Sequence, residues 1–205
     1  MRGPPGREGL RAYAVPFAVK LGLLEGSMRR ASSGSRFACP EWERRFLLNG
    51  FPAGVSVTGI RQIQDRYIAG TRLRLRRSSH SDGTIAFKLT QKSNDNAAGA
   101  LQGQFTTIYL TEDEYKIFEA LPAWVLEKTR HSVPPFGIDV FKGNLSGLIL
   151  AEAEFSSAEE AAALELPAFL FKEVTSDRRF TGGSLSVVTR QQLIGDLQGF
   201  GISLD

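Results

Sequence analysis

Acidic and basic side chains alternate in the segment from Pro40 to Leu48, which reads Pro-Glu-Trp-Glu-Arg-Arg-Phe-Leu-Leu. If this segment is a β-strand, successive side chains point to opposite faces, so Glu41, Glu43 and Arg45 share one face. Carboxylates are hard oxygen ligands that suit Mg²⁺ or Mn²⁺, and a guanidinium can bind phosphate oxygens bidentately. The segment therefore carries the groups needed to hold a metal ion beside a phosphate.

A second acidic pair and several basic residues follow at strand spacing. Glu152 and Glu154 alternate with apolar residues in the stretch Leu-Ala-Glu-Ala-Glu-Phe. The basic residues between the two acidic pairs include Arg72, Arg74, Arg76, Lys88, Lys128 and Arg130. Strict alternation puts the first three of these on one strand face and the intervening Leu residues on the other. Together, the acidic pairs and the basic rows predict a cavity that binds metal ions and a polyphosphate.

The composition restricts the class of protein. A chain of 205 residues fits one domain with a core of its own, and its single cysteine, Cys39, cannot form an intrachain disulfide. A lone thiol fits a reducing compartment, so we expect a cytoplasmic protein. The most apolar early stretch, residues 12–24, is interrupted by Pro16 and Lys20, so we expect no membrane span.

The basic character belongs mostly to one end of the chain. The isoelectric point is 9.2. Residues 1–40 contain seven basic and two acidic residues, whereas the remainder contains 18 basic and 20 acidic residues. A basic surface along the whole chain is therefore not supported, and we expect no nucleic-acid partner.

The first 36 residues differ in composition from the rest. They are rich in Gly, Pro, Ser and Arg and lack a hydrophobic period, which predicts a disordered or loosely attached extension. Two alternatives are open: the segment is a transit peptide, or it precedes a true start at Met28. Residues 37–205 are predicted to form one domain.

From residue 37 onward the pattern predicts about eight strands and three short helices. The helices are expected at 115–121, after the capping box Thr111-Glu112-Asp113-Glu114, then from Ser157 to before Pro167, and at 189–197. This pattern favours an α+β, mainly antiparallel fold, with a closed, tunnel-like, eight-stranded barrel and short helices packed outside. Charged inner positions would be too costly in a dry barrel, so they must line a solvated cavity.

The ordered motifs resemble the CYTH domain family, also called the triphosphate tunnel metalloenzymes, over about residues 41–185. The family signature Glu-x-Glu-x-Lys is represented by Glu41, Glu43 and Arg45. The later matches are Ile63-Gln64-Asp65-Arg66-Tyr67, Arg72-Leu73-Arg74, Lys88, Lys128-Thr129-Arg130, Asp139-Val140-Phe141, Leu150-Ala151-Glu152-Ala153-Glu154-Phe155, and Glu173-Val174-Thr175 with Asp177 and Arg179. Their order favours a strand at residues 41–45 over the alternative, the first turn of a helix after Pro40.

The resemblance implies a metal-dependent hydrolase of a small triphosphate: inorganic tripolyphosphate, thiamine triphosphate or a nucleoside triphosphate. It implies catalytic roles for Glu43, Glu152 and Glu154, and binding of Mg²⁺ or Mn²⁺ by Glu41, Glu43 and Glu154. It implies phosphate binding by Arg45, Arg72, Arg74, Lys88, Lys128, Arg130 and Arg179. Two alternatives are open: a class IV adenylate cyclase forming cyclic AMP and pyrophosphate, and a non-catalytic module that binds polyphosphate or nucleotide.

The sequence departs from the family pattern in two places. Arg45 stands where relatives usually have Lys, which keeps the charge but changes its geometry. Many relatives carry a third acidic pair in mid-chain, whereas residues 104–109 contain no carboxylate, which leaves fewer ligands for a second metal ion. We interpret Arg76, Arg77 and Lys92 as exposed residues. The oligomeric state is left open.

Overall fold

A computed structural model describes the backbone of residues 39–92 and 102–204, and the side chains of residues 42–92 and 105–204. The extension predicted for residues 1–36, and the side chain of Glu41, lie outside these described residues. Within the described part of the chain, no helix has the length and apolar character needed to cross a membrane.

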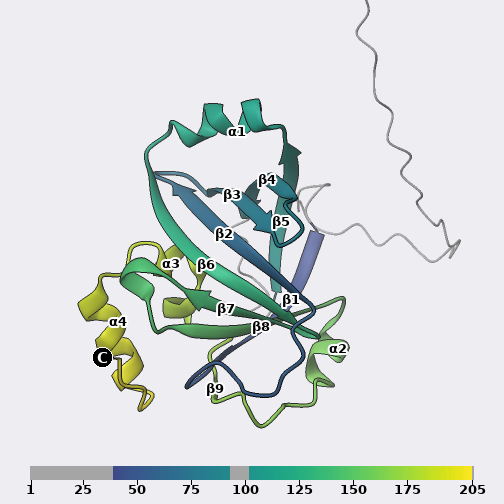
Figure 1. Cartoon of the computed structure of the whole chain (residues 1–205), viewed down its shortest axis with the longest axis vertical. Helices are drawn as coiled ribbons and strands as arrows, with labels where there is room; N and C mark the ends of the chain where they lie inside the picture. Colours follow the sequence, from purple (N-terminus) through teal and green to yellow (C-terminus); the bar gives the residue numbers. More distant parts are fainter. Residues whose placement is uncertain (1–38, 93–101, 205) are drawn as a thin grey trace, which may run out of the picture. The chain divides into compact units, whose positions relative to one another are not determined.

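The described chain forms one antiparallel sheet with short helices around it (Figure 1). The strands are β1 (Cys39–Leu47), β2 (Gly59–Ile68), β3 (Leu73–His80), β4 (Ile85–Lys92), β5 (Gln102–Leu110), β6 (Ala123–Val133), β7 (Phe136–Phe141), β8 (Ile149–Phe155) and β9 (Lys172–Glu173). Their order is β5-β4-β3-β2-β6-β7-β8-β1-β9. In addition, β1 pairs with β5 from Cys39 opposite Phe105 to Trp42 opposite Gln102. The mainly antiparallel fold is confirmed, and closure into a barrel stays a prediction.

The helices of the described chain are α1 (Glu112–Glu119), α2 (Ala158–Ala162), α3 (Gly182–Leu185) and α4 (Arg190–Gln198), with short 3-10 turns η2 (Gly143–Leu145) and η3 (Arg178–Phe180). Three of them, α1, α2 and α4, form where the capping signals predict them, and α3 is an additional short helix. Thr111 and Glu114 cap α1 reciprocally, because the Thr111 hydroxyl accepts from the Glu114 amide while the Glu114 carboxylate accepts from the Thr111 amide. Thr189 and Gln192 do the same for α4.

Side chains on the inner face of the curved sheet change character along the strands. At one end of β1, β6 and β8 the inward side chains are the buried residues Leu47, Leu126 and Leu150. Toward the other end of the same strands they are charged: Glu43, Arg45, Lys128, Arg130, Glu152 and Glu154. The apolar residues pack against Phe180, Leu185, Leu193 and Leu197 from η3, α3 and α4. The C-terminal segment therefore covers the apolar end of the inner face, and the charged end stays hollow.

The outer face of the sheet is covered in two places. Phe46 and Ile138 lie in a cluster with Leu164 and Phe169 from the segment after α2. Leu75 and Tyr115 lie in another cluster, and α1 packs there on β3, β4 and β5. Because these apolar residues alternate with the charged inner residues, burial on the outside fixes which side chains face inward.

Candidate functional site

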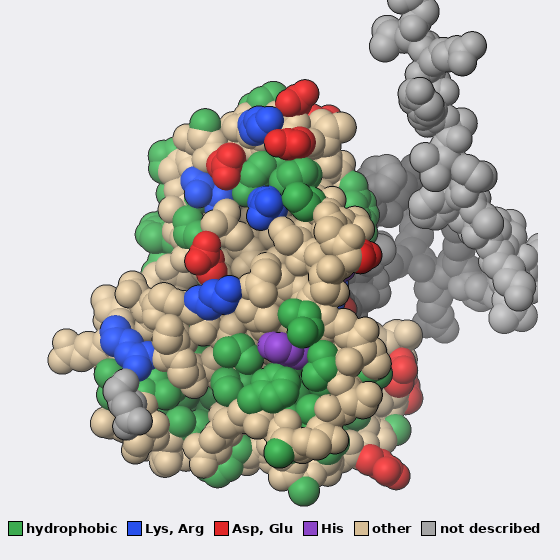
Figure 2. Space-filling model, viewed as in Figure 1, with side chains coloured by type: hydrophobic (Ala, Val, Ile, Leu, Met, Phe, Trp, Pro, Cys, Tyr) green, Lys and Arg blue, Asp and Glu red, His purple; other side chains and the backbone are tan. Residues whose placement is uncertain are grey.

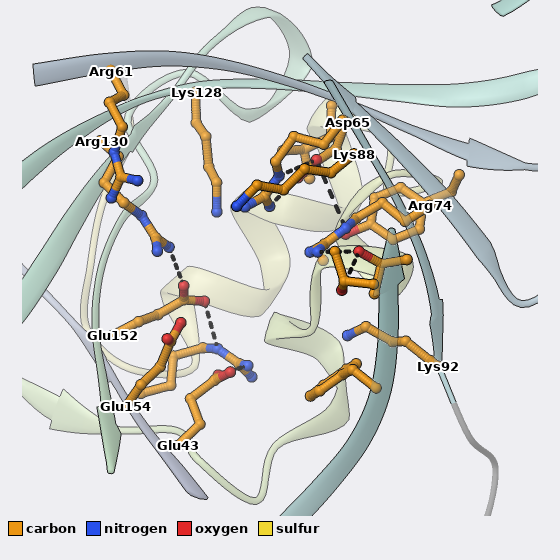
Figure 3. Close-up of a pocket in the computed structure, with 18 residues that line it drawn as sticks. Glu43, Arg61, Asp65, Arg74, Lys88, Lys92, Lys128, Arg130, Glu152 and Glu154 are labelled. Atoms are coloured by element: carbon orange, nitrogen blue, oxygen red, sulfur yellow. Dashed lines mark hydrogen bonds and ion pairs between the residues drawn. The ribbon is translucent and has the colours of Figure 1, made fainter. Parts of the chain in front are cut away.

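A cavity of about 520 Å³ lies at the charged end of the inner face (Figure 3). Its volume is within the usual range of small-molecule sites. Eight cationic side chains line it: Arg45, Arg61, Arg74, Arg76, Lys88, Lys92, Lys128 and Arg130. Four acidic side chains line it: Glu43, Asp65, Glu152 and Glu154. The lining therefore carries an excess of positive charge, which suits a multiply charged anion.

The outer surface shows no comparable excess on the face drawn in Figure 2. Basic and acidic side chains are interspersed there, and hydrophobic side chains gather around one histidine. The cavity therefore concentrates basic side chains locally. This agrees with the sequence, in which no basic surface extends along the whole chain.

Three carboxylates gather on one side of the cavity, on β1 and β8 (Figure 3). Strand register places Glu43 directly opposite Glu154, and Arg45 directly opposite Glu152. The Arg45 guanidinium donates to Glu43 and, at 3.1 Å, to Glu152. Burial and the charge of Glu152 raise the pKa of Glu43. Burial alone would also raise the pKa of Glu152, but the cations around it, Lys128 first, lower it well below the ordinary range.

A fourth carboxylate supports this side from behind the cavity wall. Asp139 on β7 is fully buried and accepts hydrogen bonds from Lys128 and Arg130. Arg130 donates to it through Nε at 2.7 Å and Nη2 at 2.6 Å, and Nη2 also donates to Glu152. Because Lys128 Nζ and two nitrogens of Arg130 donate to carboxylates, the two cations are held in fixed directions before any ligand binds.

A second buried acid holds two arginines of β3. Asp65 on β2 accepts from Arg76 Nε at 2.6 Å and Arg76 Nη2 at 2.7 Å, and lies 3.9 Å from Arg74 Nε. Burial would raise the pKa of Asp65, but the charge and hydrogen bonds of Arg76 lower it to about 2. Arg74 also donates to the Thr90 hydroxyl at 3.3 Å, and Thr90 is hydrogen-bonded to Thr107.

The side formed by β4 and β5 carries cations without acids. Lys88 Nζ lies 4.8 Å from the ring centre of Tyr109, and Lys92 Nζ lies 5.0 Å from that of Phe105. Neither lysine forms an ion pair with a carboxylate among the described side chains. Burial, followed by the positive charge of Arg74, lowers the pKa of Lys92. These two ammonium groups are therefore available to an anion in the cavity.

Gly182 and Tyr67 lie where the C-terminal segment meets the cavity. Gly182, the first residue of α3, lines the cavity, and a Cβ atom placed there would clash with the Tyr67 hydroxyl. Only glycine lets α3 approach the tyrosine this closely. Burial raises the pKa of Tyr67 to about 12, so its hydroxyl stays protonated.

The structure brings together most of the predicted site residues. Those that line the cavity are Glu43, Arg45, Arg74, Lys88, Lys128, Arg130, Glu152 and Glu154. Arg72 lies elsewhere: β3 begins at Leu73, so the arginine belongs to the preceding turn and is exposed. Arg179 also lies elsewhere, since η3 holds it at the surface in ion pairs with Asp177 and Asp196.

Four charged residues that line the cavity were not among the predicted site residues. The interpretation of Arg76 and Lys92 as exposed is wrong, because Arg76 follows Arg74 on the same strand face and Lys92 follows Lys88 at the period of two on β4. Arg77 is exposed, as predicted. Asp65 and Arg61 also line the cavity. Their common face with Tyr67 on β2 was the signal available in the sequence.

The possible metal ligands among the described side chains are a pair of carboxylates rather than a larger group. Among the described side chains, no group of three or more His, Cys, Asp or Glu is arranged to hold a metal ion. Glu43 and Glu154, however, stand directly opposite each other, an arrangement that is destabilising for like charges unless a cation lies between them. Proteins commonly hold Mg²⁺ by one or two carboxylates together with water and substrate phosphates.

No family model matches the chain. An inorganic triphosphatase from Nitrosomonas europaea is 34% identical over 158 residues, which cover 72% of this chain and 97% of the relative. The chain belongs to the CYTH, or triphosphate tunnel metalloenzyme, family. A crystal structure of an inorganic triphosphatase, 29% identical, aligns with a TM-score of 0.49 over 72% of this chain and 95% of that chain.

A Pyrococcus horikoshii protein of known structure also aligns, with a TM-score of 0.42 and 16% identity, over 60% of this chain and 83% of that chain. Of the two expected departures from the family pattern, the missing mid-chain acidic pair falls on the wall formed by β5. Phe105 and Thr107 line the cavity there, and neither can ligate a metal through a carboxylate.

Proposed function

We propose that this protein is a divalent-metal-dependent hydrolase of a small triphosphate, with inorganic tripolyphosphate as the first candidate substrate. The observation that carries the proposal is the cavity itself, which is lined by both a carboxylate pair and an excess of cations. The name of the N. europaea relative, an inorganic triphosphatase, supports the same reaction. A linear triphosphate carries its charge along a chain and therefore matches cations on several strands.

Mg²⁺ or Mn²⁺ would be held by Glu43 and Glu154, with Glu41 as a further ligand suggested by the sequence. When bound, such an ion neutralises phosphate charge and orients the attacking water. Without a cation the two opposed carboxylates repel each other. Burial, followed by the charge of Glu152, raises the pKa of Glu43, so a nearby cation would favour its charged form. Both carboxylates are thus placed to gain stability when the metal–phosphate complex enters.

The phosphates would be held between two kinds of cation. Lys88 and Lys92 approach from β4 without acidic partners, so their charge is available to the ligand. Arg45 and Arg130 face them from β1 and β6, already held by carboxylates. Phosphoryl transfer depends mainly on positioning and on neutralising the charge that develops on the transferred group, and this arrangement supplies both.

Glu152 is assigned a positioning role. One of its carboxylate oxygens accepts from Arg45 and the other from Arg130, so both are engaged by guanidinium groups. A carboxylate in that state is poorly placed to take a proton from water or to ligate a metal. We assign it to hold the two arginines toward the phosphates.

We also propose that the β1–β5 pairing closes eight strands into the tunnel of the family.

The test is a substrate panel with identified products. Purified protein is incubated with tripolyphosphate, thiamine triphosphate or ATP, each with Mg²⁺, Mn²⁺ or EDTA. We expect orthophosphate release that requires the metal and falls about a hundredfold or more in Glu43→Gln. Glu165→Gln, an exposed site outside the cavity, is the matched control.

Other products would redirect the proposal. Pyrophosphate together with cyclic AMP from ATP would identify a cyclase. Binding of tripolyphosphate in calorimetry, with no turnover of any substrate, would identify a non-catalytic module. Activity that persists in EDTA would contradict the metal requirement.

A further inference from the structure

Arg61 lies at the junction of two cavities. It lines the charged cavity, and it also lines a second cavity of about 330 Å³ formed by Thr58, Gly59, Ile60, His80, Ser81, Asp82 and Ser132. These residues belong to the beginning of β2, the end of β3 with its turn, and the end of β6. The second cavity therefore sits at the rim of the sheet, next to the end of the charged cavity.

This rim is far from the end covered by the C-terminal segment. Tyr67, at the other end of β2, meets Gly182, and Arg61 lies six residues away on the same strand face. At the rise of a β-strand this separation is roughly 20 Å. α3 covers the end of the cavity near Tyr67. A ligand longer than the part held near Asp65 and Arg45 can therefore extend toward Arg61 at the other end.

Two basic residues lie opposite Arg61 in the sheet, and the carboxylates of Asp139 and Glu154 also act on its charge. Register places it directly opposite Arg130 on β6 and opposite His80 on β3. Burial, then the charges of Arg130 and Arg76, lower its pKa. Among the described side chains it forms no hydrogen bond or ion pair, in contrast to Arg45, Arg76 and Arg130. Opposed like charges destabilise a sheet, and a bound anion would remove that cost.

The rim cavity also offers neutral donors. The hydroxyl-bearing residues Thr58, Ser81 and Ser132 belong to its lining, and the Thr58 hydroxyl donates to the Ser132 carbonyl at 3.2 Å. Its one acid, Asp82, accepts from the Thr84 amide at 2.8 Å within the turn, so part of its charge is compensated locally. A guanidinium with several hydroxyls is a set of groups that binds phosphate oxygens.

We infer that Arg61 binds the phosphate unit beyond the third in a linear polyphosphate, so that the protein accepts chains longer than tripolyphosphate. This inference rests on the proposed function. A fourth phosphate would lie between Arg61 and the rim hydroxyls while the first three occupy the charged cavity. An uncharged organic group has no comparable partner there, since the unpaired group is a cation.

The experiment compares tripolyphosphate, tetrapolyphosphate and ATP with wild-type protein, Arg61→Gln and Arg61→Lys. Arg77→Gln, an exposed arginine that lines neither cavity, is the matched control. We expect Arg61→Gln to raise the KM for tetrapolyphosphate about tenfold, the usual effect of losing a hydrogen bond to a charged group, and to change that for tripolyphosphate less than twofold. Arg61→Lys should retain part of the preference.

Three results would overturn the inference: equal changes for the two polyphosphates, no change for either, or a selective change for ATP, which would place an organic group at the rim. If wild-type protein hydrolyses no substrate, the proposed function fails separately. Calorimetry then measures the affinity of wild type and Arg61→Gln for tripolyphosphate and tetrapolyphosphate. A loss of affinity confined to tetrapolyphosphate would support the role of Arg61, and equal losses or no loss would contradict it.

Discussion

The two sides of the cavity hold their cations in different ways. On the side of β1, β6, β7 and β8, Arg45, Lys128 and Arg130 are all paired with carboxylates, including Asp139. On the side of β4 and β5, Lys88 and Lys92 meet aromatic rings instead. The paired side is organised by the protein itself, whereas the unpaired side keeps charge available for a ligand.

This difference separates stability from binding. A buried cation that loses its acid is strongly destabilising, so substitutions on the paired side should act mainly on folding. A cation without an acid contributes little to folding, so substitutions on the β4 side should act mainly on ligand affinity. The following experiments test this separation, beginning with the largest expected effect.

Asp139→Asn should produce the largest loss of stability. The substitution leaves Lys128 and Arg130 without their shared buried carboxylate, and breaking a buried pair in this way costs about 3 to 5 kcal/mol. Urea unfolding measures the change, with Asp113→Asn, at a surface site on α1 whose side chain is 96% exposed, as the control. A loss below about 1 kcal/mol would contradict the role given to Asp139.

Asp65 should make stability depend on acidity. Its pKa is about 2 in the folded protein, below its ordinary value of 3.8, so its contribution is present above pH 4 and is lost as the pH falls toward 2. The shift corresponds to about 2 kcal/mol. The free energy of unfolding, measured from pH 5 to pH 2, should fall more steeply in wild type than in Asp65→Asn. Parallel curves would show that the Arg76 pair does not stabilise the fold.

Lys92→Gln should weaken binding without weakening the fold. The ammonium has no acidic partner among the described side chains, so its removal should change the free energy of unfolding by less than about 0.5 kcal/mol. The KM for tripolyphosphate should rise about tenfold, because one charged contact to phosphate is lost. Lys172→Gln, at an exposed site on β9, is the control. A large loss of stability would erase the proposed distinction between the two sides.

Tyr109→Ala should have the smallest effect. Its ring faces Lys88, but the side chain is largely exposed, and cation–π contacts at exposed sites are weak. We expect the KM for tripolyphosphate to change about two- to threefold. A tenfold change in the same kinetic assay would mean that the ring positions Lys88 for the ligand, and β5 would then belong to the binding machinery.

Much of the fold could be predicted from local patterns. The alternation around Glu43 and Glu152 predicts the inner faces of β1 and β8, and Thr111 with Glu114 predicts the start of α1, because period and capping depend on neighbours in the chain. Arg72 was misplaced because alternation does not say where a strand begins. β3 starts one residue later, and this leaves Arg72 in a turn.

The sequence by itself determined the strand faces, the helix caps and the placement of two acidic pairs among cationic rows. Only the tertiary structure decided which cations have partners. Asp65 reaches Arg76 from the neighbouring strand β2, and Asp139 reaches Arg130 from β7. These pairings depend on strand order and register, which bring together residues that local periodicity cannot relate. The same long-range arrangement leaves Arg61 unpaired among the described side chains at the rim.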